Sequence, residues 1–167
     1  MGRRASLIVL SLVLGTVCDA NTATLVDDDG WETVTKSVPE VILKDINAKY
    51  LEKVRPILKG KCLVCHGINQ SLPWYAIIPG AKQLINDDME EAKEHIDMSN
   101  DFPFEGHGRP QDDLEQLGKM IDKGEMPPFR YKLLHWSSSL TENEKRAVQD
   151  WINDSLIIMN KAMEEKK

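Results

Sequence analysis

The feature that most constrains this chain is the segment Cys62-Leu63-Val64-Cys65-His66, which holds two of the chain's three cysteines. Residues i and i+3 of a helical turn lie on the same side of a helix, so the two thiols are expected to be close together and similarly directed. The imidazole of His66 follows directly in sequence. The spacing therefore predicts a helical turn that presents two thiols and one imidazole to a common neighbour.

The pattern C-x-x-C-H is the attachment signature of haem c. Two thiols add across the vinyl groups of a rigid ring, which requires the fixed spacing of Cys62 and Cys65. The histidine that follows the second cysteine then approaches the iron from the same side. We predict one haem c, bound covalently through Cys62 and Cys65, with His66 as the proximal iron ligand.

Three other kinds of site can use closely spaced cysteines. A redox dithiol of the thioredoxin kind needs a strand–helix setting, for which this sequence gives no clear sign. Structural zinc usually needs a second pair of ligands, whereas His95, His107 and His135 are single histidines. A disulfide across two residues is strained and closes a very short loop. All three are less favoured than haem, and the motif alone does not remove them.

The second axial ligand of such an iron has to come from elsewhere in the chain. Met126 stands before Pro127 and Pro128, which exclude a regular helix and hold the side chain on a stiff loop. Soft thioether sulfur stabilises ferrous iron and raises the reduction potential. We predict Met126 as the distal ligand, with His135 as the runner-up and an open site as a further alternative.

Residues 1–20 have the composition of a secretory signal peptide. They combine Arg3 and Arg4, an apolar run at 7–14 and small residues up to Ala20. The run is too short for the roughly 20 residues that span a bilayer, so no integral membrane segment is expected in the mature chain. We predict cleavage after Ala20 and a periplasmic product, with lipid anchoring through Cys18 as the minor alternative.

The charge of the chain bears on its partners. The formal net charge is −6, and removal of Arg3, Arg4 and Asp19 with residues 1–20 makes it −7. An acidic protein is poorly suited to nucleic acid or to an anionic membrane surface. We therefore expect redox partner proteins with a basic docking surface, and no nucleic acid.

The remaining chain is predicted to be all-α, a cytochrome c-like helical domain with long loops around one haem. Residues 21–40, which contain an Asp-Asp-Asp-Gly run, are predicted as a flexible lead-in, and residues 41–163 as the haem-binding domain. Helical spacing begins near Ile42 and is interrupted at Pro56. No stretch alternates in the manner of a strand.

The helix ends also leave signals in the sequence. Thr141 with Glu144, and Asp112 with Glu115, fit the pattern of a capping box at a helix start. The last helix has an apolar face that includes Trp151, which we predict to lie in the core.

Several motifs taken together resemble a known family. They are VRPILKGKCLVCHG, LPWYAIIPG, GEMPPFRYKLLH and LTENEKRAVQDW, and they span roughly two-thirds of the chain after residue 20. The pattern resembles the exported cytochrome c-like haem-binding domain family. The resemblance implies a cytochrome c-like helical fold, thioether bonds at Cys62 and Cys65, and His66 and Met126 as axial ligands.

The chain departs from the family pattern at some positions. Gly67 stands where the family usually has serine, and Ala92-Lys93 where it often has Gly-Arg. Trp74 and Tyr75 either pack on the haem or bond a propionate, or they seal their loop against the helices.

These observations predict an exported monohaem c-type cytochrome that passes single electrons between redox partners and is not an enzyme. One alternative is a peroxidase or gas sensor with an open or labile distal site, for which His107, His135 and Arg109 are the candidate distal groups. Another is the haem subunit of a larger oxidoreductase complex.

Overall fold

The computed structural model describes residues 22–26, 32–68, 72–106 and 108–165. The predicted signal peptide, with Cys18, and His107 lie outside the described residues. The described chain is mostly helical, which confirms the predicted all-α class. It divides into two compact units, residues 1–37 and residues 38–167. In the described ranges, no helix combines the length and apolarity needed to cross a bilayer.

The first unit contains a two-stranded ladder. Strand β1 (Thr22–Val26) pairs antiparallel with β2 (Glu32–Lys36), so that Thr22 lies opposite Lys36 and Val26 lies opposite Glu32. The prediction that no stretch forms a strand was wrong here. Three of the five residues in each strand are threonine or valine, and β-branched residues favour strands once a partner strand is available.

The second unit opens with a helical run that ends just before the cysteine motif. Helix α1 (Glu40–Lys49) continues through the wider π-type turn η1 (Tyr50–Val54) into α2 (Arg55–Leu58). The amide of Arg55 bonds to the carbonyl of Tyr50, five residues earlier. Pro56 has no N–H to continue the ordinary ladder, so the predicted interruption takes the form of a wider turn.

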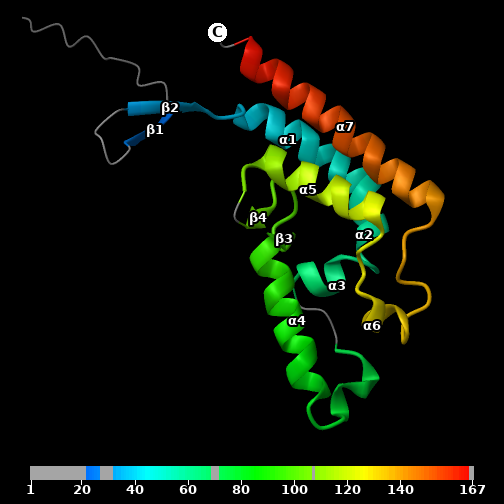
Figure 1. The fold of residues 1–167 in the computed structure, drawn as a ribbon. Helices are drawn as coiled ribbons and strands as arrows, with labels where there is room; N and C mark the ends of the chain where they lie inside the picture. Colours follow the sequence, from blue (N-terminus) through cyan, green and yellow to red (C-terminus); the bar gives the residue numbers. More distant parts are fainter. Residues whose placement is uncertain (1–21, 27–31, 69–71, 107, 166–167) are drawn as a thin grey trace, which may run out of the picture. The chain divides into compact units, whose positions relative to one another are not determined.

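The remaining elements follow in chain order. They are α3 (Leu63–His66), η2 (Trp74–Ile77), α4 (Ala81–His95), β3 (Ile96–Asp97), β4 (Glu105–Gly106), α5 (Pro110–Lys123), α6 (Phe129–Lys132) and α7 (Glu142–Glu164). Strands β3 and β4 form a short antiparallel ladder. Helix α7 lies along α1 and α5, while α3 packs against α4 (Figure 1). The cysteine motif is thereby placed between α4 and the layer formed by α1, α5 and α7.

An aromatic cluster fills the core of the second unit. The ring of Tyr50 lies 5.4 Å from those of Phe104 and Trp151, and Phe102 lies 5.7 Å from Trp151. The Trp151 indole N–H donates to the carbonyl of Ile46 at 3.4 Å, which joins α7 to α1. The prediction that Trp151 lies in the core is confirmed, since only 5% of this residue is exposed.

The helix ends show one correct and one wrong prediction. Thr141 and Glu144 form the predicted capping box at the start of α7. Helix α5 begins at Pro110, so Asp112 is its third residue and its carboxylate accepts from the amide of Arg109. The predicted box of Asp112 with Glu115 was wrong, because proline favours the first position of a helix and the N-cap is Arg109, three residues earlier than predicted.

Candidate functional site

The cysteine motif forms a tight helical turn directly after α2. The amide of Cys62 bonds to the carbonyl of Leu58 at 2.8 Å, and the carbonyl of Cys62 accepts from the amides of Cys65 at 3.1 Å and His66 at 3.0 Å. The turn ends at Gly67, whose amide bonds to the carbonyl of Leu63. Cys62 and Cys65 therefore stand one helical turn apart, and both thiols are free.

The two thiols have different surroundings. Cys62 packs against the hydrophobic core, and burial raises the pKa of its thiol to about 11. Cys65 instead lies on the wall of a cavity. Its pKa is also raised, first by burial and then by the negative charge of Asp88. Both groups are therefore thiols, rather than thiolates, at neutral pH.

The ring of His66 is oriented by a carbonyl from a distant part of the chain. Its Nδ1 atom lies 2.8 Å from the carbonyl oxygen of Ile96 at the start of β3. A carbonyl can only accept, so Nδ1 carries the proton and Nε2 carries the lone pair, which is the form of the ring that binds a metal. Burial lowers the pKa of His66, which favours the neutral form that metals bind. The amide of Met98 also bonds to the His66 carbonyl at 2.8 Å.

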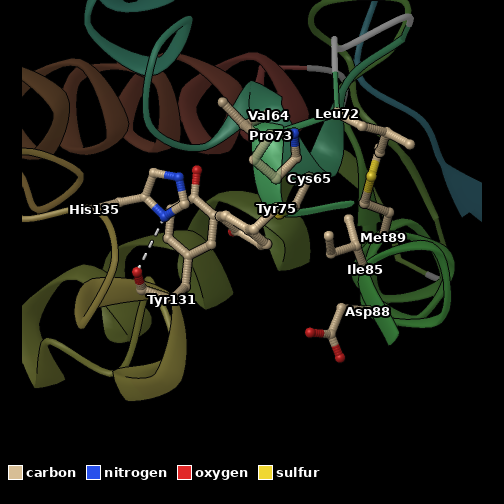
Figure 2. Close-up of a pocket in the computed structure, with 10 residues that line it drawn as sticks. All are labelled: Val64, Cys65, Leu72, Pro73, Tyr75, Ile85, Asp88, Met89, Tyr131 and His135. Carbon is tan, nitrogen blue, oxygen red and sulfur yellow. Dashed lines mark hydrogen bonds between the residues drawn. The ribbon is translucent and has the colours of Figure 1, made fainter. Parts of the chain in front are cut away.

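A cavity of about 290 Å³ lies beside the motif (Figure 2). Its walls come from α3, the segment that leads into η2, one side of α4, and α6 with the turn after it. The lining residues are mainly aliphatic and aromatic: Val64, Cys65, Leu72, Pro73, Tyr75, Ile85, Asp88, Met89, Tyr131 and His135. This cavity gives the second cysteine a largely apolar space, as a flat hydrophobic ring requires.

A stacked pair of rings forms one wall of the cavity. The ring of His135 lies on that of Tyr131 with centroids 4.0 Å apart and an interplanar angle of 11°. Its Nδ1 atom lies 3.2 Å from the Tyr131 carbonyl oxygen, as the dashed line in Figure 2 shows. Tyr75 approaches the same histidine at 5.8 Å between centroids. Because Nδ1 faces a carbonyl, the Nε2 atom of His135 also carries the lone pair.

The structure brings together some of the predicted site residues and separates others. Cys65, Tyr75 and His135 meet at the cavity, whereas Trp74 is 77% exposed. Met126 is 44% exposed in the segment between α5 and α6 and is not part of the cavity wall. Its assignment as the distal ligand stays a prediction, and the runner-up His135 is the candidate that lines the cavity.

Two arginines near the predicted site form ion pairs, and one of them, Arg109, was a candidate distal group. Arg109 is exposed and bonds to Asp112 at 2.9 Å. Arg130 of α6 pairs with Asp88 of α4, so an ion pair connects two walls of the cavity. Asp88 lines the cavity but was not among the predicted site residues. A carboxylate in a strongly charged helix has no local signal that identifies its partner 42 residues later.

Tyr131 was predicted only as part of the family pattern. Its four-residue separation from His135 was a usable signal, because residues i and i+4 share one face of a helical turn. The pKa of Tyr131 is raised by burial and then by its proximity to Cys65.

Lys61, the residue before the first cysteine, is also held by long-range contacts. Its Nζ atom lies 2.6 Å from the Glu144 carboxylate and 2.8 Å from the Ser139 carbonyl oxygen. The start of the motif is thereby attached to the N-terminal end of α7.

These residues fit a haem group. Two thiols stand on one turn, the adjacent imidazole carries its lone pair on Nε2, and an apolar cavity lies beside the second thiol. The carbonyl that orients His66 is the kind of outer contact that metal-binding histidines commonly make. In the described part of the chain, no group of three or more His, Cys, Asp or Glu side chains is placed to hold a metal ion.

One curated relative gives an activity for comparison. The chain is 32% identical over 103 residues to "Cytochrome c peroxidase Ccp" of Escherichia coli (strain K12), which is 60% of this chain and 22% of the relative. The chain therefore matches about a fifth of the length of that protein. The named relative is an enzyme, so the prediction that this chain is not an enzyme is contradicted.

The family comparison covers most of the chain. No solved structure matches it. The model of the "Haem-binding domain" family matches residues 32–154, which include the cysteine motif, the cavity walls and most of α7. The shared segment agrees with the thiol pair, the oriented imidazole and the apolar cavity, and the chain belongs to the haem-binding domain family.

Proposed function

We propose that this chain carries one haem c and that the haem passes single electrons in peroxide reduction, as part of a cytochrome c peroxidase. The observation that carries the proposal is the turn on which Cys62 and Cys65 stand beside an imidazole whose Nδ1 atom is held by the Ile96 carbonyl, which leaves the lone pair on Nε2. The family match supports the haem, and the named relative supports the peroxidase context.

The residues have distinct roles in this proposal. Cys62 and Cys65 would hold the haem through thioether bonds, in which each S–H group adds across one vinyl group, so no oxidant is needed. His66 would hold the iron through Nε2, while the carbonyl of Ile96 orients its ring. When bound, the haem supplies a one-electron couple. The apolar walls around Cys65 exclude water from it.

We propose Met126 as the second residue that would hold the iron. Its thioether would favour the ferrous state, which suits a haem that transfers electrons. The loop would have to bring the half-exposed side chain to the iron.

We also propose that the chain works outside the cytoplasm and meets redox partners with a basic docking surface. The apolar run at residues 7–14 and the net charge of −6 support this part of the proposal.

A second candidate function is direct peroxide reduction at an open haem face. It is favoured by one observation: Tyr131 and His135, both able to hydrogen-bond, line the cavity beside Cys65. In that case His135 would act on a bound peroxide, and Met126 would stay away from the iron.

The first test is the mass and visible spectrum of the denatured chain after expression with export and haem-attachment machinery. We expect the mass of one haem on the wild type and none on the variant with both Cys62→Ala and Cys65→Ala. A wild-type chain that is colourless under these conditions contradicts covalent haem.

Carbon monoxide then separates the two candidate functions. We expect the ferrous protein to bind it poorly if Met126 occupies the iron. Ready binding, together with rapid consumption of hydrogen peroxide in the presence of a small electron donor, would favour the open-site peroxidase instead.

A further inference from the structure

The contact between Lys61 and Glu144 links two segments that are 83 residues apart in the chain. The Nζ atom of Lys61 lies 2.6 Å from a carboxylate oxygen of Glu144, and it also donates to the Ser139 carbonyl oxygen at 2.8 Å. Only 16% of the lysine side chain and 29% of the glutamate side chain are exposed. Charges in such a place are screened less by solvent than those of an exposed pair.

Glu144 has a second set of contacts at the start of α7. The same carboxylate oxygen accepts from the amide of Thr141 at 2.7 Å and from its hydroxyl at 2.8 Å. Lys61 and the two Thr141 donors lower the pKa of Glu144 to about 2. Glu144 is therefore ionised at neutral pH, and it cannot turn away without giving up the helix cap.

Lys61 is covalently next to Cys62, the first of the two attachment residues. The amides of both residues bond to the carbonyl of Leu58, at 3.1 Å and 2.8 Å, so the turn that carries the lysine also carries the thiol. A group joined to Cys62 is therefore one residue along the chain from the positive charge of Lys61. The negative charge of Glu144 is held against that lysine.

We propose that Lys61 and Glu144 are a positioning pair that holds the attachment turn on α7 and sets the reduction potential of the haem. The inference rests on the proposed function, because it requires haem at Cys62 and Cys65. Ferric haem carries one more positive charge than ferrous haem. The ammonium group of Lys61 therefore favours the ferrous state, and the carboxylate of Glu144 favours the ferric state.

If Lys61 and Glu144 have only a structural role, the expected changes in reduction potential differ from those of an electrostatic role. If the pair only fastens the turn, breaking it from either side loosens the same contact, and both single variants change the potential in the same direction. If the charges act on the iron, removal of the positive charge and removal of the negative charge shift the potential in opposite directions.

The test is a redox titration of the holo chain, carried out on two single variants, their double variant and one control variant. Lys61→Met keeps an unbranched side chain that is one atom shorter and removes its charge, and we expect a lower potential. Glu144→Gln retains an acceptor for the Thr141 cap, and we expect a higher potential. The double variant is expected to lie between the two single variants.

The control is Lys44→Met, which breaks the 2.8 Å pair of Lys44 with Glu40 on α1. Both of these side chains are more than 70% exposed. At about 1.5 Å of rise per helical residue, Lys44 lies roughly 20 Å along the helical run from Leu58, the last residue of α2. That distance exceeds the screening length of about 8 Å at physiological salt, so no change in potential is expected.

The possible results test the role of the Lys61–Glu144 pair separately from the proposed function. Shifts of the two single variants in the same direction, or no shift in either, overturn the role of the pair while haem remains attached. A wild-type chain without covalent haem overturns the proposed function itself, and with it this inference.

Discussion

The Nδ1 atom of His66 lies 2.8 Å from the carbonyl oxygen of Ile96, 30 residues later in the chain. The amide of Met98 donates a second hydrogen bond, to the His66 carbonyl. Both the ring and the backbone of His66 are therefore bonded to the segment after α4. The ring therefore has a defined orientation, and so does the lone pair on its Nε2 atom.

Replacement of Met126 tests the predicted distal ligand. In Met126→Ala we expect loss of the weak far-red absorption band that a bond between methionine sulfur and ferric iron produces, and a fall in reduction potential. The matched variant His135→Ala should keep the band. Loss of axial ligation in His135→Ala, with a normal Met126→Ala spectrum, would move the assignment to the cavity histidine.

Gly67 should not tolerate a side chain, although the family usually has serine here. A Cβ atom at this position would lie 2.7 Å from the carbonyl oxygen of Leu63, within the turn that carries the cysteines. We expect Gly67→Ser to destabilise the fold by about 1–3 kcal/mol, as overpacking does, and to lower the yield of haem-bearing protein. Gly60→Ala, just before the motif, meets nothing within 4 Å and is the control. Equal yields from the two variants would show that the turn can shift to accept the side chain.

Truncation of Met159 tests how far α7 depends on its buried face. This side chain is fully buried, so Met159→Ala is expected to cost about 2–5 kcal/mol of unfolding free energy. Ile157, two residues earlier, is 65% exposed, and Ile157→Ala should change stability by less than about 0.5 kcal/mol. Urea denaturation of both holo variants gives the comparison. Similar losses in the two would indicate that the opposite face of α7 is also covered.

The pKa of Glu144 predicts how stability depends on acid. This pKa is about 2 in the folded chain, below its usual value of 4.5, because Lys61 and Thr141 stabilise the carboxylate. The stabilisation is therefore complete above about pH 4.5 and is lost as the pH falls from there through about 2. The advantage of wild type over Glu144→Gln in urea denaturation midpoint should shrink across that range. A difference that stays constant with pH would show that the folded carboxyl titrates normally.

The features that sequence analysis predicted correctly depend on short-range spacing. The positions of Cys62, Cys65 and His66 in one turn follow from their separation of three and four residues, and the Thr141 cap follows from the same geometry. The apolar face of α7 likewise predicted that Trp151 is buried. Even here, local rules competed: proline at the first position of α5 determined its start over a plausible capping pattern.

The sequence by itself determined the thiol pair, the adjacent imidazole and the helical class, because each is encoded by residues within a few positions of one another. Only the tertiary structure decided that Ile96 orients His66, that His135 rather than Met126 lines the cavity, and that Lys61 meets Glu144. These contacts join segments tens of residues apart. They depend on how the helices pack, because the sequence around a residue does not identify the distant residue that it will contact.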